Sequence, residues 1–244
     1  MKSVMTASIV ALVCMAGSAS AATVTSTFNG VGPVVNMNFS LTDPTATNGG
    51  TQAGVFNWTG TAGNPAGLQG GYRAFCIELT QNVSPNTSYT YQTAALEMAP
   101  QPATTVTPMG AAKASAIREL FGRFYSPSFG FDINGPGISN EEAAAMQLAL
   151  WEIVYETASS SGPGPGAAFG LNFGLAGGNA VFSGNASVLG LASGFLAALD
   201  GTGPQALDLI ALTSDTAQDM LIPTPGTAVL AGLGLVAAGR RRRR

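Results

Sequence analysis

Two residues of this chain could together carry out covalent chemistry. Cys76 is one of 2 cysteines, and the other lies within the first 21 residues. Gln147 lies in a predicted apolar helix, where a primary amide must find hydrogen bonds or cost about 1–3 kcal/mol. If the strand of Cys76 packs on this helix, the thiol can attack the amide carbon, expel ammonia and form an internal thioester. Both residues also have a structural interpretation, as a small buried side chain and a core amide bonded to backbone.

The composition excludes most other catalytic chemistry. The chain has no histidine, so imidazole bases, histidine metal sites and Cys–His or Ser–His pairs are excluded. No phosphate-binding loop, nucleotide fingerprint or nucleophile elbow occurs. We therefore expect no catalytic residues, no metal and no cofactor. The enzymatic alternative is a secreted hydrolase that uses two carboxylates, but helix capping and solvation explain the candidates more simply: Glu141, Glu142, Glu152 and Glu156.

The two reactive residues lie in motifs at 75–78 and 147–151. Their sequences, Phe-Cys-Ile-Glu and Gln-Leu-Ala-Leu-Trp, resemble the thioester-domain proteins of bacterial surfaces, in which an aromatic-Cys strand pairs with a helix of the form Gln-x-Ala-Ile-Trp. The resemblance implies an internal thioester between Cys76 and Gln147, which a partner's amine or hydroxyl would attack. It also implies shielding of that bond by aromatic neighbours, and we assign this role to Trp151 and Phe75.

Residues 1–21 are predicted to be a secretory signal peptide. Lys2 supplies the positive charge, the segment 9–16 is apolar, and Ala19-Ser20-Ala21 fits a cleavage site. The mature protein would then begin at Ala22. The alternative is an uncleaved N-terminal anchor, for which the apolar segment is short.

The other end of the chain has the layout of a membrane tail. The segment Pro223-Thr224-Pro225-Gly226 precedes an apolar run over 227–239. As a helix, that run would extend ~20 Å, somewhat short of the ~30 Å hydrocarbon core of a bilayer. The positive-inside rule would keep the terminal arginines in the cytoplasm; these are Arg240, Arg241, Arg242, Arg243 and Arg244.

This order of motif, apolar helix and arginines resembles the PEP-CTERM sorting signal of exosortase-bearing Gram-negative bacteria. The family's core tripeptide is Pro-Glu-Pro, whereas this chain has Pro223-Thr224-Pro225. The resemblance implies that an exosortase-like membrane enzyme removes the tail and that the body reaches the cell surface or extracellular matrix. The alternative is a plain C-terminal membrane anchor.

The body between the two ends is acidic. The two targeting segments hold 6 of the 10 basic residues, which leaves 4 basic against 13 acidic side chains, a net charge of −9. Charged residues make up only 9% of the chain, against roughly 25% in ordinary soluble domains. An acidic body with isolated basic side chains offers no surface for phosphate backbones, so nucleic acid is excluded as a partner.

The fold that must position Cys76 and Gln147 is predicted as α+β and mostly β, an antiparallel sheet or sandwich-like domain with two or three packed helices. Alternating segments rich in Val, Phe, Trp and Thr predict strands at 24–28, 34–41, 54–61, 73–79, 88–96, 207–213 and 217–222. Helices are expected at 111–125, 140–157 and about 187–199. The second should be buried on most faces and start with a capping box at Ser139 and Glu142.

Together these features predict a signal peptide (1–21), a thioester-domain-like body (22–222) and a sorting signal (223–244). We expect an exported structural or adhesive protein that is held transiently in the inner membrane and then delivered to the cell surface or matrix. Its expected partners are the exosortase-like enzyme and surface amines, hydroxyls or extracellular polysaccharide. The alternatives are the secreted hydrolase and a matrix protein without reactive chemistry.

Overall fold

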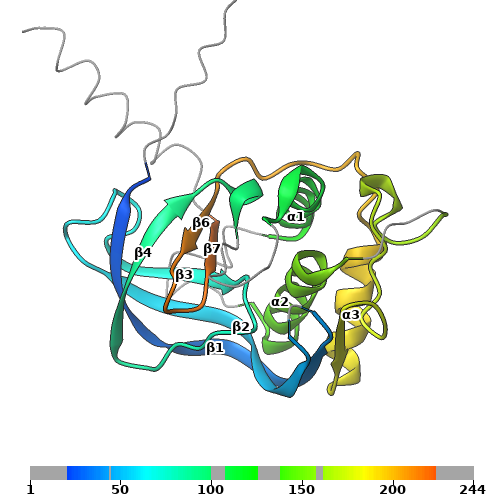
Figure 1. Ribbon diagram of the computed structural model, residues 1–244, viewed down its shortest axis with the longest axis horizontal. Helices are drawn as coiled ribbons and strands as arrows, with labels where there is room; N and C mark the ends of the chain where they lie inside the picture. The colour runs from blue at the N-terminus through cyan, green and yellow to red at the C-terminus, as the bar shows by residue number, and fades with distance from the viewer. Residues whose placement is uncertain (1–20, 44, 100–107, 126–137, 158–161, 224–244) are drawn as a thin grey trace, which may run out of the picture.

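The computed structural model describes residues 21–43, 45–99, 108–125, 138–157 and 162–223 (Figure 1). The strands are β1 (Thr23–Leu41), β2 (Thr47–Gly60), β3 (Gly70–Cys76), β4 (Thr87–Ala94), β5 (Ala180–Ser183), β6 (Leu209–Thr213) and β7 (Met220–Pro223). The helices are α1 (Gly110–Phe124), α2 (Asn140–Tyr155) and α3 (Ala186–Ala197), with 3-10 turns at Leu96–Met98 and Ala167–Phe169. The expected α+β, mostly β fold class is confirmed.

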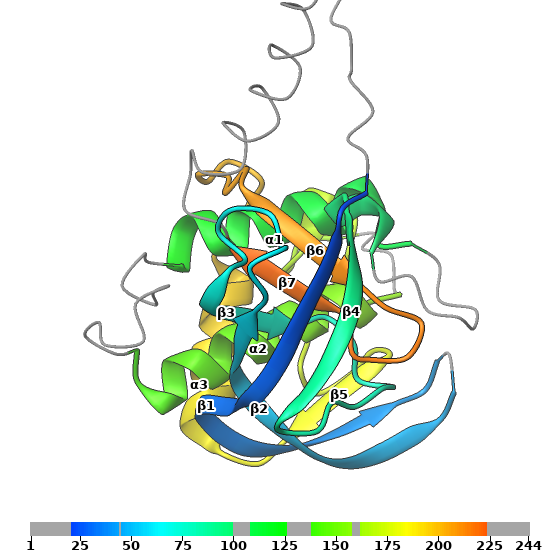
Figure 2. The same ribbon diagram turned by 90° about the vertical axis from the view of Figure 1, so that its left-hand side faces the viewer.

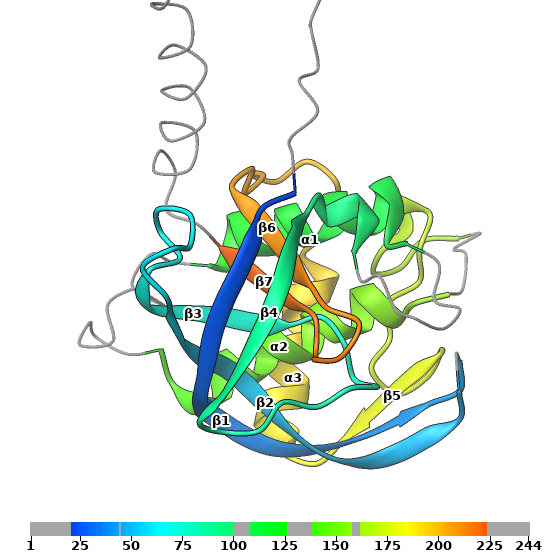
Figure 3. The same ribbon diagram turned by 60° about the vertical axis from the view of Figure 1, so that its left-hand side comes forward.

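The strands form one antiparallel sheet that closes on itself. Their order is β2-β3-β7-β6-β4-β1-β5, and β2 also pairs with β1, so six strands complete a ring and β5 extends it beside β1. The long β1–β2 hairpin changes register after Phe28 and again after Val31. Such bulges bend a strand, and the hairpin curves strongly around the lower part of the molecule (Figures 2 and 3).

Two strand predictions are corrected by the structure. The segments 24–28 and 34–41 are not separate strands but parts of β1, because the bulges bend the chain without ending its pairing with β2. The strand expected over 73–79 ends at Cys76. After Ile77, the next backbone N–H groups bond to side chains instead of a strand: that of Glu78 contacts Cys76 Sγ, and that of Leu79 donates to Tyr155 Oη at 2.8 Å.

The prediction that the second helix is buried on most faces is confirmed by α2. Every residue from Ala143 to Tyr155 is buried, because α2 contacts β1, β2 and β3 as well as α1 and α3. The three helices lie together on one side of the strands (Figure 1). The capping box is confirmed, since Ser139 Oγ accepts the Glu142 N–H and the Glu142 carboxylate accepts the Ser139 N–H at 3.1 Å each. α1 and α3 confirm the other two predicted helices.

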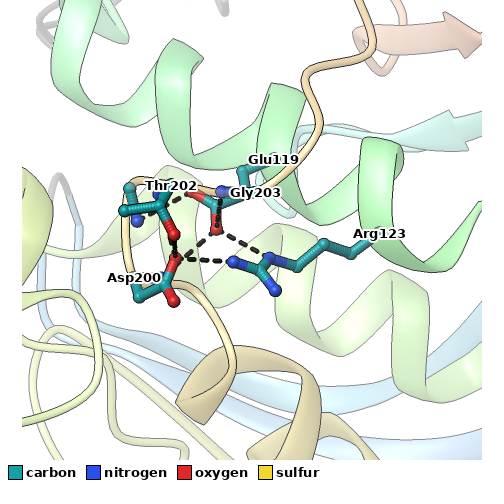
Figure 4. A network of polar contacts seen from close by, with 6 residues as sticks. Glu119, Arg123, Asp200, Thr202 and Gly203 are labelled. Atoms are coloured by element: carbon teal, nitrogen blue, oxygen red, sulfur yellow. Dashed lines mark hydrogen bonds and ion pairs between the residues drawn. The ribbon is translucent and has the colours of Figure 1, made fainter.

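A buried carboxylate of α1 binds the turn that follows α3. Glu119, in α1, is fully buried, and its two oxygens accept the backbone N–H groups of Asp200, Gly201 and Gly203 at 2.9–3.2 Å. The Arg123 guanidinium donates to Glu119 at 2.7 Å and to Asp200 at 2.5 Å (Figure 4). The Glu119 side chain therefore joins α1 to the turn at 200–203 through hydrogen bonds to the backbone of that turn.

Candidate functional site

The fold brings Cys76 and Gln147 together. Cys76 is the last residue of β3 and pairs with Met220 of β7, whereas Gln147 lies in the second turn of α2. Both side chains are fully buried. The meeting of this strand and this helix, which the thioester hypothesis requires, is therefore present.

The Gln147 amide lies against the backbone of Cys76. Its Oε1 accepts the Cys76 N–H at 2.9 Å, and its Nε2 donates to the Cys76 carbonyl oxygen at 2.7 Å. These reciprocal bonds give a hydrogen-bond partner to both polar atoms of the buried amide and to the N–H and carbonyl groups of Cys76, the last residue of β3. They also fix the amide carbon beside the residue that carries the thiol.

The thiol itself is directed toward the next turn of the chain. Cys76 Sγ donates to the carbonyl oxygen of Glu78 at 2.6 Å. Burial raises the pKa of the Cys76 thiol strongly, the hydrogen bond with Glu78 lowers it, and the nearby Glu78 and Asp219 carboxylates raise it further. Cys76 is therefore a neutral thiol at neutral pH, and it is shielded from solvent reagents.

The two aromatic residues assigned to shielding lie on different sides of Cys76. Trp151 is fully buried on α2. Its indole N–H makes no hydrogen bond of good geometry within the described residues, but it lies close enough to the Cys76 thiol to lower the pKa of that thiol. The Trp151 ring stacks on Phe182 of β5 at 6.2 Å between centroids. Phe75 contacts Phe121 of α1 edge-on at 5.5 Å, on the strand face opposite Cys76.

Several polar groups around the thiol were not predicted as part of the site. The Glu78 carboxyl is buried, accepts from Thr80 Oγ1 at 2.5 Å and from the Asp219 N–H at 3.3 Å, and has a pKa raised by desolvation. Gln218 Nε2 donates to the Glu78 carbonyl oxygen at 3.0 Å. The sequence held one indication that Glu78 is buried, because this residue lies between the apolar Ile77 and Leu79. Nothing in the spacing connects Gln218 and Asp219 to a cysteine more than 140 residues earlier.

The four carboxylates in and next to α2 differ in exposure between the start and the end of the helix. Glu141 and Glu142 are exposed at its start, as expected for capping. Glu152 and Glu156 are buried, so their predicted solvation is wrong, because the 170–180 segment covers that side of α2 and the Gly174 N–H donates to Glu152 at 2.7 Å. Neither residue lines the two pockets described in this structure.

We expect Glu152 to make stability depend on pH. Burial raises its pKa to about 7, opposed by the bond from Gly174 and reinforced by Glu156. The folded protein then holds this proton more tightly than the unfolded chain, so the stability that Glu152 contributes is fully present below pH ~4.5 and is lost as pH rises through about 7, by up to about 3 kcal/mol. In Glu152→Gln this contribution should disappear, so the change in stability between pH 5 and pH 8, measured by urea unfolding, should be smaller than in the parent protein.

The control for this prediction is Glu141→Gln, which changes an exposed carboxylate of the same helix. It should keep the pH dependence of the parent protein. An equal dependence in parent and Glu152→Gln would contradict the prediction.

The predicted sorting motif is described only at its first residue. Pro223 is buried at the end of β7 and pairs with Leu209 of β6. Thr224, Pro225, Gly226 and the arginines at 240–244 lie outside the described residues, as do residues 1–20 of the predicted signal peptide. Within the described ranges, no helix has the length and apolar character needed to cross a membrane.

The comparisons with known proteins give no relatives from which a function could be transferred. No family model, no curated protein and no solved structure matches this chain.

Proposed function

We propose that this chain is an exported surface or matrix protein whose body, residues 22–222, carries an internal thioester between Cys76 and Gln147. The observation that supports the thioester most directly is the pair of hydrogen bonds, 2.7 and 2.9 Å, between the Gln147 amide and the Cys76 backbone. They hold an amide carbon next to a buried cysteine. The function would be covalent attachment to a surface partner, in a structural or adhesive role.

The proposed bond forms without an external cofactor. The thiol turns from the Glu78 carbonyl toward the Gln147 amide carbon; the C–S bond forms, the C–N bond breaks, and the thiol proton leaves with the nitrogen as ammonia. Attack by a partner's amine or hydroxyl then breaks the C–S bond, joins the Gln147 acyl carbon to the partner and returns a proton to sulfur. Burial of both residues supports this chemistry, because it keeps water from an activated acyl group.

A second account is supported by the same hydrogen bonds. Because the Cys76 backbone satisfies both polar atoms of the Gln147 amide, the pair could serve packing alone in a matrix protein. The two accounts differ in covalent structure, so mass distinguishes them. The hydrolase alternative receives no such support, since Glu152 and Glu156 are buried within the helix packing.

We expect the intact mass of the purified protein to be lower by one ammonia than its sequence mass. Methylamine should then add once and release one titratable thiol. Cys76→Ala should show neither effect. A full sequence mass together with a titratable Cys76 thiol in the unfolded parent protein would refute the thioester and leave the packing account.

Export and sorting are proposed from the two ends of the sequence. In a host with an exosortase-like enzyme, the same mass measurement reports both termini. We expect a start at Ala22 and loss of the tail after the segment 223–226. A mature protein that keeps its terminal arginines would contradict the sorting proposal without bearing on the thioester.

A further inference from the structure

A polar groove lies beside the bend of the β1–β2 hairpin. It has a volume of about 540 Å³ and is lined by the bend of β1 and β2, the segment joining β3 to β4, and Gln218 of the β6–β7 segment. In Figure 3, the segment joining β3 to β4 passes along the inner side of the curved β1–β2 ribbon. No charged residue lines the groove among the described residues, although the body is strongly acidic.

Side-chain amides dominate the exposed part of this lining. Asn36 and Asn38 lie on one face of β1, and Gln52 of β2 is directly opposite Asn36. Asn38 faces Gly50, which has no side chain to fill the space. Asn82 lies on the segment joining β3 to β4. All four amides are exposed.

These amides have no partner within the described part of the protein. Asparagines nearby behave differently: Asn57 Nδ2 donates to the Gly32 carbonyl oxygen at 2.9 Å, and Asn64 bonds to the backbone of Thr25. The groove therefore presents donors and acceptors that the fold itself does not use.

One side chain of the groove lining lies close to Cys76. Gln218 lines the groove and donates to the Glu78 carbonyl oxygen, the same atom that accepts from Cys76 Sγ. Phe56 also lines it and pairs with Ala74, which shares a strand face with Cys76. One carbonyl oxygen thus separates a groove side chain from the thiol.

We propose that this groove binds a neutral carbohydrate chain. Each sugar hydroxyl both donates and accepts a hydrogen bond, as does each side-chain amide, and the groove adds the apolar surface of the half-buried Val31 and Val83 and the exposed Pro85. An anionic ligand would find no Lys or Arg in the lining, and an ammonium group would find no carboxylate. A ligand without charge and with many hydroxyls matches this lining best.

Binding at the groove goes beyond the proposed thioester and does not require it. Where the thioester forms, a carbohydrate in contact with Gln218 would lie one side chain and one carbonyl group away from the sulfur of Cys76. That consequence rests on the proposed function, so binding is tested in Cys76→Ala, where no thioester can form.

The test is titration of Cys76→Ala, followed by NMR, with cellotetraose, maltotetraose, tetragalacturonate, a chitosan tetramer and a short lysine peptide. We expect a neutral tetrasaccharide to bind, and Asn36→Ala or Gln52→Ala to weaken it about tenfold, the loss of one or two hydrogen bonds. Both side chains are exposed and unbonded, so these variants should fold normally.

The matched control is Asn48→Ala, an exposed asparagine of β2 that does not line the groove; it should leave the affinity unchanged. Binding of neither neutral tetrasaccharide, or tighter binding of the charged sugars or lysine peptide, would overturn the proposal. The mass measurement on the parent protein reads the thioester separately, so failure of one proposal is distinguishable from failure of the other.

Discussion

Gln147→Met should lower the free energy of unfolding by about 2–4 kcal/mol, because it leaves both the N–H and the carbonyl of Cys76 buried without partners. Methionine nearly matches the length of glutamine and accepts hydrogen bonds only weakly. In the parent structure these backbone groups bond to the amide at 2.9 and 2.7 Å. Urea unfolding should be measured with Cys76→Ala present in both proteins, so that no thioester contributes to the difference.

The control for Gln147→Met is Leu150→Met on the same helix. Leu150 is equally buried, and the substitution introduces the same residue type without removing a hydrogen bond. Volume-conserving swaps of this kind cost less than about 1.5 kcal/mol. Equal losses in the two variants would mean that the amide does not pair with the Cys76 backbone.

The second large effect is expected for Glu119→Gln, which should lower the free energy of unfolding by about 3 kcal/mol. The carboxylate accepts from the N–H groups of Asp200, Gly201 and Gly203 and from Arg123. Glutamine keeps the shape but replaces one acceptor oxygen with an amide donor that faces other donors. The charge that strengthens the remaining bonds is also lost. Urea unfolding would measure the difference.

Glu97→Gln provides the comparison for Glu119→Gln. Glu97 also pairs with an arginine of α1, Arg118, at 2.7 Å, but its side chain is 36% exposed. Exposed ion pairs contribute about 1 kcal/mol or less, so this variant should be nearly as stable as the parent. Similar stability of Glu119→Gln and Glu97→Gln would show that the turn at 200–203 does not depend on the buried carboxylate.

The helices and the fold class could be predicted because they depend on local patterns. The apolar run that follows Ser139 and Glu142 has no polar face, which predicts a helix enclosed on most sides, and α2 is one. The β1 strand was harder, because two bulges interrupt its alternation, one between Phe28 and Gly30 and one between Val31 and Val34. Glu152 was assigned to solvent because its surroundings depend on a segment around Gly174 that is distant in sequence.

By itself, the sequence determined which residues could react. It has one cysteine outside the first 21 residues, no histidine, and a glutamine within an apolar helix; residue types alone limit the chemistry to those groups. The tertiary structure alone decided that the Gln147 amide bonds to the backbone of Cys76, that the Glu78 and Asp219 carboxyls lie near the thiol, and that Gln218 lines the groove. These contacts join residues about 70 to 140 positions apart, and no local pattern specifies them, because they arise only when the strand ring closes against α2.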